Sequence, residues 1–331
     1  MALLCAGLLF GAVSCSSSDA NSAAHRPVKI VVGFGAGGAM DTLARAVAAR
    51  LSERLKRPVY VENRAGAGGA IAASYVAQAR PDGNTLLLAS PAEIFVNRIY
   101  GNGLGESALQ GLLPVARLSS APIVLVARSD SGIKKIGEIA AESRSRPQGL
   151  SFASSGVGSL QHLQGERLSH FIGAELVHVP YNGASTAIGG LLGKQVDLLL
   201  AGVAPVASYI ESKKLRVLGV AAPSRLPQFP DIPTFKEAGV TGPELEYWQG
   251  IFLPLGTSLE IADAWAVQLQ GVLVEDLLAQ QLAAQGFLVA FKDRVQFSDF
   301  LREEETLYQG MQVNGCEASV REGCPLSGPV R

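Results

Sequence analysis

A glycine-rich turn between an expected strand and an expected helix is the first part of the sequence suited to chemistry. The stretch 28–41 reads VKIVVGFGAGGAMD, a β-branched apolar run and then glycines that let a backbone turn sharply and approach a ligand closely. A helix that begins on such a turn points unsatisfied N–H groups and the positive end of its dipole into the space above the strand. This arrangement favours an anion, either a phosphate or a carboxylate.

The same glycines raise a specific alternative, a Rossmann-like NAD-dependent enzyme. Gly33, Gly35 and Gly38 have the spacing of the dinucleotide fingerprint, and Glu62 ends the next expected strand, where a ribose-binding acid would lie. Asp41 argues against it, because a carboxylate in the first helical turn would repel a pyrophosphate. A lone match of this kind is weak, so this hypothesis ranks second.

A second turn of small residues carries hydroxyl groups and a histidine. Ser154, Ser155 and Ser159 surround two glycines, and His162 follows on an expected helix. Serine and histidine could indicate a nucleophile, but there is no G-x-S-x-G elbow, and no acid obviously orients His162. The other histidines have no metal-like spacing. We predict a binding protein rather than an enzyme, with no metal and no cofactor.

Parallel strands must bring these turns together. Three strand–turn–helix units in succession open the chain, which predicts a parallel sheet with its loops gathered at one edge. The second half repeats this pattern. The expected strands are 29–34, 59–63 and 85–89 in the first half and 150–153, 175–179, 196–201 and 215–222 in the second.

Two crossings join the halves. Segments 114–119 and 123–128 are strand-like with little between them, and 223–233 holds four prolines. A return strand is expected at 248–253, and a helix at 258–285 begins the elements that pack back on the first half. Two α/β lobes joined in this way form a hinge around a cleft, which is the default place for a ligand.

Composition and the N-terminal segment indicate an exported protein. The chain has 331 residues, 48% of them apolar, and a net charge of −1, which allows two domains and lacks the basic footprint of a nucleic-acid-binding protein. Segment 2–13 is apolar, too short to span a bilayer and typical of a signal peptide. Ala12–Cys15 resembles a lipobox, so we expect lipidation of Cys15. Ordinary cleavage near Ala23 or Ala24 is the alternative.

Two further cysteines lie near the C-terminus. Cys316 and Cys324 are separated by seven residues in a segment with glycine and proline. An oxidising compartment would allow a local disulfide between them. Two free thiols in a disordered tail are the alternative that the sequence leaves open.

Seven short motifs along the chain resemble those of one protein family. They are IVVGFGAGGAMD at 30–41, VENRAGAGG at 61–69, PDGNTLLL at 81–88, FASSGVGS at 152–159 with His162, HVPYNG at 178–183, GKQVD at 193–197, and PDIPT at 230–234 with Glu237 and Gly239. In this order they resemble the substrate-binding proteins of the tripartite tricarboxylate transporter system, the Bug or TctC-like periplasmic receptors. The resemblance covers about 26–307.

The resemblance implies a fold and a function. The fold is α/β and periplasmic binding protein type II-like, with two lobes joined by two crossover strands. The implied function is an extracytoplasmic solute receptor that closes on a small organic carboxylate, or a related small molecule, in the inter-lobe cleft. The expected boundaries are a signal peptide and tether at 1–25, the first lobe at 26–120 and 225–312, the second lobe at 121–224 and a tail at 313–331.

The resemblance also implies partners and a location. The receptor would be a periplasmic monomer that delivers its ligand to two integral-membrane permease subunits. It would touch the membrane only through a lipid anchor and would bind no nucleic acid. A receptor that serves a signalling partner instead of transport would have the same sequence features.

The family pattern implies which residues face the ligand. Backbone N–H groups and hydroxyls suit a carboxylate. Asp41 is awkward beside an anion, and we expect it to cap the helix; holding the loop, a water or an amino group of the ligand is the alternative. Asn182, where Lys or Arg is common in the family, favours a less acidic ligand. The implied residues are Phe34, Gly37, Gly38, Asp41 and Ser90 in the first lobe, and Ser154, Ser155, Gly156, His162, Tyr181 and Gly202 in the second.

Overall fold

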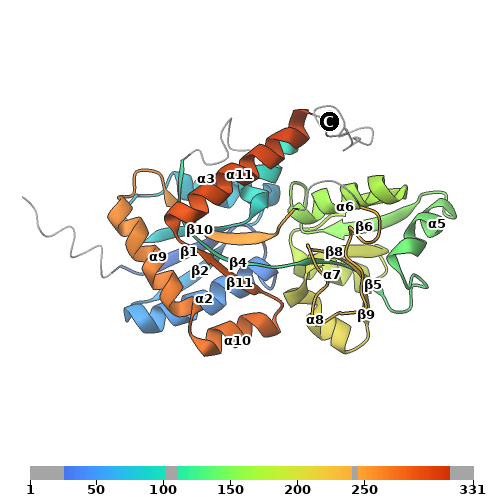
Figure 1. Cartoon of the computed structure of the whole chain (residues 1–331), viewed down its shortest axis with the longest axis horizontal. Coiled ribbons are helices and arrows are strands. Elements are labelled where there is room, and N and C mark those ends of the chain that lie inside the picture. Colours follow the sequence, from blue (N-terminus) through green and yellow to red (C-terminus); the bar gives the residue numbers. More distant parts are fainter. Residues whose placement is uncertain (1–25, 102–110, 241–244, 314–331) are drawn as a thin grey trace, which may run out of the picture.

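The computed structural model describes residues 26–101, 111–240 and 245–313, the side chains of the last element as far as Gln309. Two α/β lobes lie side by side in it, each with its own sheet (Figure 1). Cys15, Cys316 and Cys324 fall outside the described residues, so the expectations for a lipid anchor and a disulfide stay predictions.

A six-stranded sheet forms the first lobe, in the order β11-β4-β10-β3-β1-β2. The first three strands of the chain pair in parallel, as predicted, but β10 inserts antiparallel between β3 and β4. The sheet is therefore mixed. Its strands are β1 (Val28–Val32), β2 (Val59–Asn63), β3 (Thr85–Ala89), β4 (Leu112–Ser120), β10 (Trp248–Pro254) and β11 (Leu288–Lys292), of which β11 was not predicted.

A five-stranded sheet forms the second lobe, in the order β7-β6-β8-β5-β9. Here β6 pairs in parallel with β7 and β8, whereas β5 runs antiparallel to both of its neighbours. The strands are β5 (Ile123–Arg128), β6 (Leu150–Ser154), β7 (Leu176–Pro180), β8 (Leu198–Gly202) and β9 (Leu215–Ala221).

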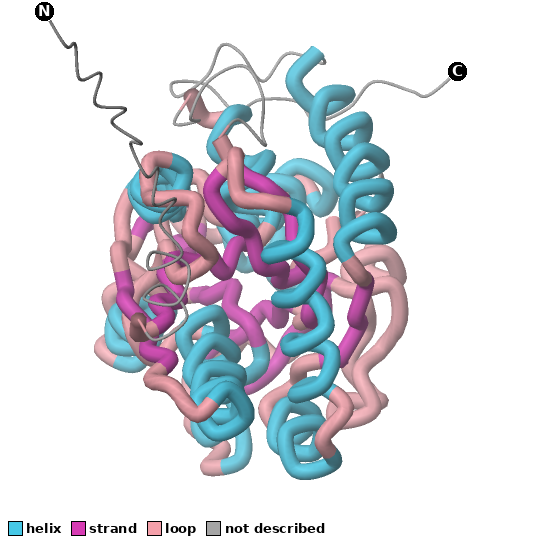
Figure 2. Tube along the Cα trace, turned by 90° about the vertical axis from the view of Figure 1, so that its left-hand side faces the viewer, coloured by secondary structure: helices cyan, strands magenta, loops and turns pink. Residues whose placement is uncertain are grey.

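Helices surround the strands in the view of Figure 2. The predicted helix over 258–285 is wrong as one element, because the chain leaves the helical conformation at Glu275 and starts a second helix. The first-lobe helices are α2 (Ala39–Leu55), η1 (Ala67–Gly69), α3 (Ala70–Ala77), η2 (Ala92–Val96), α4 (Asn97–Ile99), α9 (Leu259–Leu273), α10 (Asp276–Ala284) and α11 (Arg294–Val313). The second-lobe helices are η3 (Ile136–Glu138), α5 (Ile139–Arg144), α6 (Leu160–Ile172), α7 (Ala184–Leu192) and α8 (Val203–Glu211).

The two crossings run beside each other. One is the short step from β4 to β5 through Ala121 and Pro122, and the other leads from β9 to β10. The N–H of Ala121 donates to the carbonyl of Tyr247 at 2.8 Å, so the crossings are joined by a backbone hydrogen bond. The connections between the lobes therefore lie side by side at one place.

Candidate ligand-binding cleft

A cavity of about 260 Å³ lies between the lobes, at the carboxyl ends of β1 and β2 on one side and of β6 and β7 on the other. Each lobe contributes half of the wall. None of the described residues that line it is charged. They are Gly33, Phe34, Ala65, Gly66, Ala67 and Gly68 from the first lobe, and Ser155, Gly156, Val157, Pro180, Tyr181 and Asn182 from the second.

The first glycine turn is held by Asp41, which does not line the cavity. The Asp41 carboxylate accepts hydrogen bonds from Gly37 N–H, Arg45 Nε and Asn63 Nδ2, each at 2.9 Å. Burial alone would raise the pKa of Asp41, but these bonds outweigh it and lower the pKa below its usual value. The helix cap is Gly38, so the capping prediction is wrong and the loop-holding alternative agrees with the structure.

The second glycine turn, 64–69, forms much of the first-lobe wall, although only its motif was recognised in the sequence. Gly66, Gly68 and Gly69 all have positive φ, which glycine adopts without strain. A β-carbon added to Gly68 would lie 2.9 Å from the carbonyl oxygen of Val157 in the second lobe. The turn must therefore be glycine for the lobes to come this close. The sequence does contain a signal for this turn. The carboxyl ends of neighbouring parallel strands lie at one edge of a sheet, so the turn after β2 is expected beside the turn after β1.

The second-lobe turn, between β6 and α6, offers its backbone to the cavity. Ser155 and Gly156 line the cavity, while Ser154 is fully buried beneath them. Ser154 Oγ accepts from the N–H of Gly156 at 3.1 Å. Ser159 caps α6 by accepting from the N–H of His162 at 3.2 Å. Ser154 and Ser159 thus fix the shape of the turn, and Ser155, Gly156 and Val157 between them line the cavity.

Two histidines stand behind this turn, and their partners correct one expectation. The rings of His162 and His178 stack with centroids 3.7 Å apart. Glu166 Oε1 lies 3.1 Å from His162 Nε2, so an acid does orient His162. Ser154 Oγ lies 2.7 Å from Nε2 of the other imidazole, that of His178. Serine and acid therefore contact different rings, and no Ser–His–acid chain forms among these four residues.

Burial decides the ionisation of His178, whereas hydrogen bonds decide that of Glu166. Burial, and then repulsion by His162, lowers the pKa of His178 to about 3, so this ring is neutral at physiological pH. Burial would raise the pKa of Glu166, but hydrogen bonds from His162 and Tyr100 hold it below its usual value. Glu166 is therefore an ionised acceptor at the boundary between the lobes.

Tyr100 of the first lobe contacts this second-lobe cluster. It follows α4 in the first lobe, and its ring stacks on His162 of the second lobe at 4.4 Å. Its hydroxyl donates to Glu166 Oε2. A second bridge joins Ser185 Oγ to the carbonyl of Ala36 at 3.0 Å. The lobes therefore touch through the side chains of Tyr100 and Ser185. The sequence analysis did not identify Tyr100 or Glu166.

The remaining predicted residues divide between the cavity and the lobe contacts. Phe34 and Tyr181 line the cavity. A β-carbon on Gly37 would lie 2.8 Å from Ser185 Oγ, and one on Gly202 would lie 3.0 Å from the side chain of Ala39. A β-carbon on Gly38 would lie 3.8 Å from the β-carbon of Ala184. These three glycines lie where the lobes meet, outside the cavity wall.

Ser90 is also outside the cavity wall. It is fully buried, and its hydroxyl donates to Glu93 Oε2 at 2.6 Å. Glu93 belongs to η2, a π-helical turn, rather than to the α-helix expected there. Such turns are rare and concentrate at functional sites.

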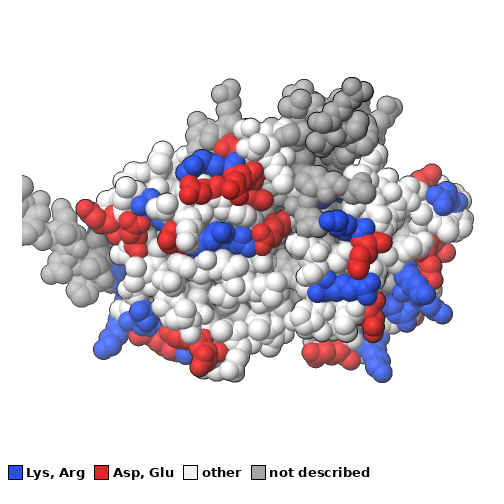
Figure 3. Space-filling model, viewed as in Figure 1, with Lys and Arg blue, Asp and Glu red and all other residues white. Residues whose placement is uncertain are grey.

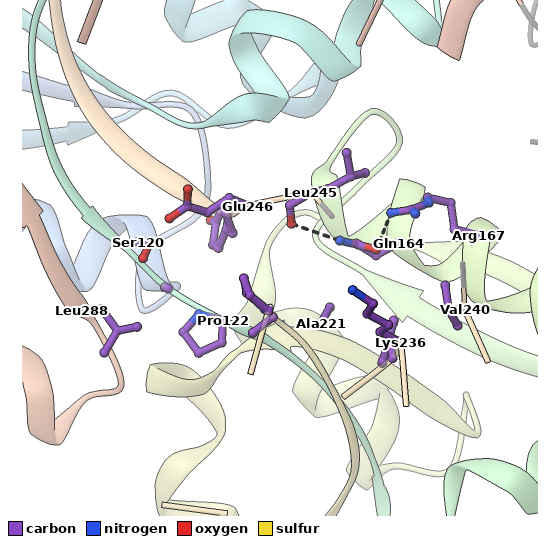
Figure 4. Close-up of a pocket in the computed structure, with 15 residues that line it drawn as sticks. Ser120, Pro122, Gln164, Arg167, Ala221, Lys236, Val240, Leu245, Glu246 and Leu288 are labelled. Carbon is purple, nitrogen blue, oxygen red and sulfur yellow. Dashed lines mark hydrogen bonds between the residues drawn. The ribbon is translucent and has the colours of Figure 1, made fainter. Parts of the chain in front are cut away.

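A second cavity, of about 100 Å³, lies at the crossings and shares no lining residue with the first. Figure 4 shows Ser120 and Pro122 of one crossing and Ala221 at the start of the other around it. Gln164 of α6 donates to the carbonyl of Leu245 at 3.3 Å. This second cavity therefore has walls from both lobes and from both crossings.

Surface charge gives no single-signed face in the view of Figure 3, where acidic and basic side chains are interspersed. No group of three or more His, Cys, Asp or Glu in the described ranges is placed to hold a metal ion. Within the same ranges, no helix has the length and apolarity needed to cross a bilayer.

Comparison with known proteins identifies the family to which this two-lobed fold belongs. The family model described as the tripartite tricarboxylate transporter family receptor, TctC, matches residues 43–311. This chain belongs to that receptor family. Family members of this kind are periplasmic solute-binding proteins rather than a class of enzymes.

Relatives of the receptor share most of its length. A UPF0065 protein from the tcbD–tcbE intergenic region of Pseudomonas sp. (strain P51) is 33% identical over 289 residues, 87% of this chain and 86% of that one. The solved structure of the periplasmic binding protein BugD has a TM-score of 0.81 at 31% identity, covering 86% of this chain and 95% of that one. MatC from Rhodopseudomonas palustris, solved with bound malate, has a TM-score of 0.79 at 29% identity, covering 86% and 98%.

Proposed function

We propose that this receptor binds a small organic carboxylate in the cavity between the glycine turns and closes around it at the two crossings. One observation supports this proposal most directly. Each lobe contributes half of the cavity wall, and the wall is built from backbone turns rather than charged side chains. N–H groups at the starts of helices and the Ser155 hydroxyl are donors suited to a carboxylate. MatC, of the same fold and 29% identical, is described with malate.

The direct test is a titration. We expect malate, succinate or adipate to bind the purified protein by isothermal titration calorimetry and to raise its melting temperature, because a ligand that binds only the folded state stabilises it by mass action. Ser155→Ala should weaken binding, whereas Ser212→Ala, at the exposed end of α8, should not. A panel of di- and tricarboxylates, aromatic acids and amino acids that gives no binding would overturn the proposal.

The dinucleotide alternative gains no support from the geometry. Glu62 forms an ion pair with Lys29 at 2.7 Å and another with Arg64, so it is already neutralised. A β-carbon on Gly35 would lie 2.8 Å from the carbonyl oxygen of Asn182. The turn is thus packed against the other lobe where a pyrophosphate would have to lie. NADH added to the protein should show no change in fluorescence.

We further propose that the first lobe consists of residues 26–120 and 225–312 and the second lobe of residues 121–224. The receptor would deliver its ligand to a pair of membrane permease subunits. Uptake of labelled ligand should depend on both the receptor and the neighbouring permease genes. Uptake that persists without the receptor, with a changed transcriptional response instead, would favour the signalling role.

The proposed location is the periplasm, with Cys15 carrying the lipid. Cys15→Ala should move the protein from the membrane fraction to the soluble periplasmic fraction. Equal distribution of the two forms would favour ordinary cleavage near Ala23 or Ala24.

A further inference from the structure

Glu93 lies directly behind the first-lobe wall of the cleft cavity. A β-carbon added to Gly33, which lines the cavity, would lie 2.8 Å from Glu93 Oε1, and one on Gly69 would lie 2.7 Å from the same oxygen. The Glu93 side chain therefore fills the space that side chains on these two glycines would need. Only backbone separates its carboxyl group from the ligand space.

The two oxygens of this carboxyl group have different surroundings. Oε2 accepts from the N–H of Ser90 at 2.9 Å and from its hydroxyl at 2.6 Å. Oε1 is buried and has no hydrogen-bond partner among the described residues. No ion pair within the described ranges involves Glu93. Glu93 therefore has hydrogen bonds on one oxygen and, among the described residues, no counter-charge in contact with the other.

Neighbouring titratable groups leave Glu93 without a counter-charge. From the segment before β10, Tyr247 faces it, and burial and Glu93 itself raise the pKa of that phenol, which stays neutral. On the elements packed against η2, His162 and Glu166 of α6 pair with each other, Arg98 pairs with Glu305 of α11, and Glu304 of α11 bonds Trp248. Arg167 of α6 donates to Gln164. Tyr308 of α11 stacks on Phe95, and burial raises the pKa of its phenol, which stays neutral. Burial, partly offset by hydrogen bonds from Ser90 and its own backbone, raises the pKa of Glu93 to about 7.

An anionic ligand would meet this group across a wall of glycine backbone. Like charges in a poorly solvated interior repel strongly, and the ionised form of the weaker acid is then disfavoured. No charged residue among those described lines the cavity to screen the pair. The repulsion disappears when Glu93 carries a proton.

We propose that Glu93 is a specificity-determining residue of the cleft, which couples the binding of an acidic ligand to the uptake of one proton. This rests on the proposed function and deepens it. Binding of an anion raises the pKa of Glu93 in the complex. Affinity for the anion is therefore highest at a pH below the pKa of Glu93 in the free protein. It falls as the pH rises from that pKa to the higher pKa of Glu93 in the complex, and is constant above it. A ligand with no charge, such as a diamide, is not subject to this coupling.

The test measures Kd by calorimetry for malate and adipate from pH 6 to 8.5, a range in which ordinary carboxylates are already ionised. For the native protein we expect affinity to fall about tenfold, the effect of one unit of pKa shift. Near pH 7 the binding heat should change with the ionisation enthalpy of the buffer, which reports proton uptake. Malamide and adipamide, wherever they bind, should show neither effect.

Two isosteric variants separate Glu93 from other buried acids. Glu93→Gln should abolish the pH dependence and bind malate or adipate more tightly than the native protein at pH 8.5. Glu304→Gln is the matched control, because burial also raises the pKa of Glu304 to about 7 while its contact is Trp248 in the first-lobe core. It should keep the fall in affinity.

The outcomes are distinct. If the native protein binds an acid with a Kd that does not change with pH and a binding heat that does not change with the buffer, the inference is overturned without any variant. A fall in affinity that survives in Glu93→Gln also overturns it and assigns the proton to another group. If neither acid binds at any pH, the proposed function fails for these acids, and the coupling inferred here fails with it.

Discussion

The Tyr100 hydroxyl of the first lobe donates a hydrogen bond to the Glu166 carboxylate of the second. The two residues are 66 positions apart in the chain and lie on different lobes. On the second-lobe side, Glu166 also pairs with His162, whose Nδ1 accepts from the N–H of Gly158 in the cleft turn at 3.4 Å. A contact between the lobes is thus connected to a turn that lines the cleft cavity.

Removing this contact should weaken ligand binding. Tyr100→Phe keeps the stack on His162 and deletes the hydroxyl. We expect Kd to rise about tenfold, because a hydrogen bond to a charged group contributes roughly 1.5 kcal/mol and 1.4 kcal/mol is a factor of ten. Calorimetry gives the Kd, and small-angle scattering gives the fraction of closed receptor. Tyr60→Phe, on the exposed side of β2, is the control, and an unchanged Kd for Tyr100→Phe would exclude the contact from closure.

Closure should be sensitive to one methyl group at Gly35. Because a β-carbon there would lie 2.8 Å from a backbone oxygen of Asn182, Gly35→Ala should hold the lobes apart. Overpacking costs about 1–3 kcal/mol, so we expect binding about tenfold weaker or more, with a nearly unchanged melting temperature for the unliganded protein. Gly189→Ala in α7, where a β-carbon would meet nothing within 4 Å, should bind normally. Equal affinities in the two variants would contradict the prediction.

Ser154 should act on binding through the shape of the cleft turn. Ser154→Ala leaves the N–H of Gly156 without its acceptor, and an unsatisfied group of this kind costs about 1–3 kcal/mol. We expect lower stability in urea unfolding and a Kd raised about tenfold. Ser151 is a matched control on the same strand, since its hydroxyl bonds Asp197 at 2.8 Å instead of the turn. Ser151→Ala should lower stability and leave Kd unchanged; a parallel loss of affinity would show that destabilisation alone explains both variants.

The buried acid Glu304 should make stability depend on pH. Burial raises its pKa from 4.5 to about 7, so the folded state holds the proton more tightly than the unfolded state. Stability from this group is fully present below pH 4.5 and is lost as pH rises to about 7. Glu304→Gln should therefore be more stable than the native protein at pH 8, by about 1–2 kcal/mol after allowance for partial solvent screening. Urea unfolding should show the difference vanishing at pH 4.5.

The sequence by itself predicted much of the fold, because the information involved is local. The apolar run 28–34 and the glycines after it specify a strand and a turn through backbone sterics alone. The crossings at 121–122 and after β9 follow from where the strand–turn–helix rhythm stops and restarts. The strand at β10 was predicted, but its antiparallel place between β3 and β4 and the short strand β11 were not, because the pairing partners are remote in sequence.

The candidate site shows the same division. Local pattern placed Phe34, Ser155, Gly156 and Tyr181 at the ends of strands, and the structure brings these four to one cavity. Only the tertiary structure decided which glycines line that cavity and which pack lobe against lobe, since both kinds have the same local turn.

Tyr100, Glu166 and Glu93 were decided by tertiary structure alone. A tyrosine after a helix and two glutamates on helices look like ordinary surface or packing residues in a sequence. Their roles come from a lobe contact and from burial behind Gly33, and both depend on how the two lobes and their loops are placed in space. Local sequence sets the backbone of each turn, whereas burial and charge are properties of the assembled fold.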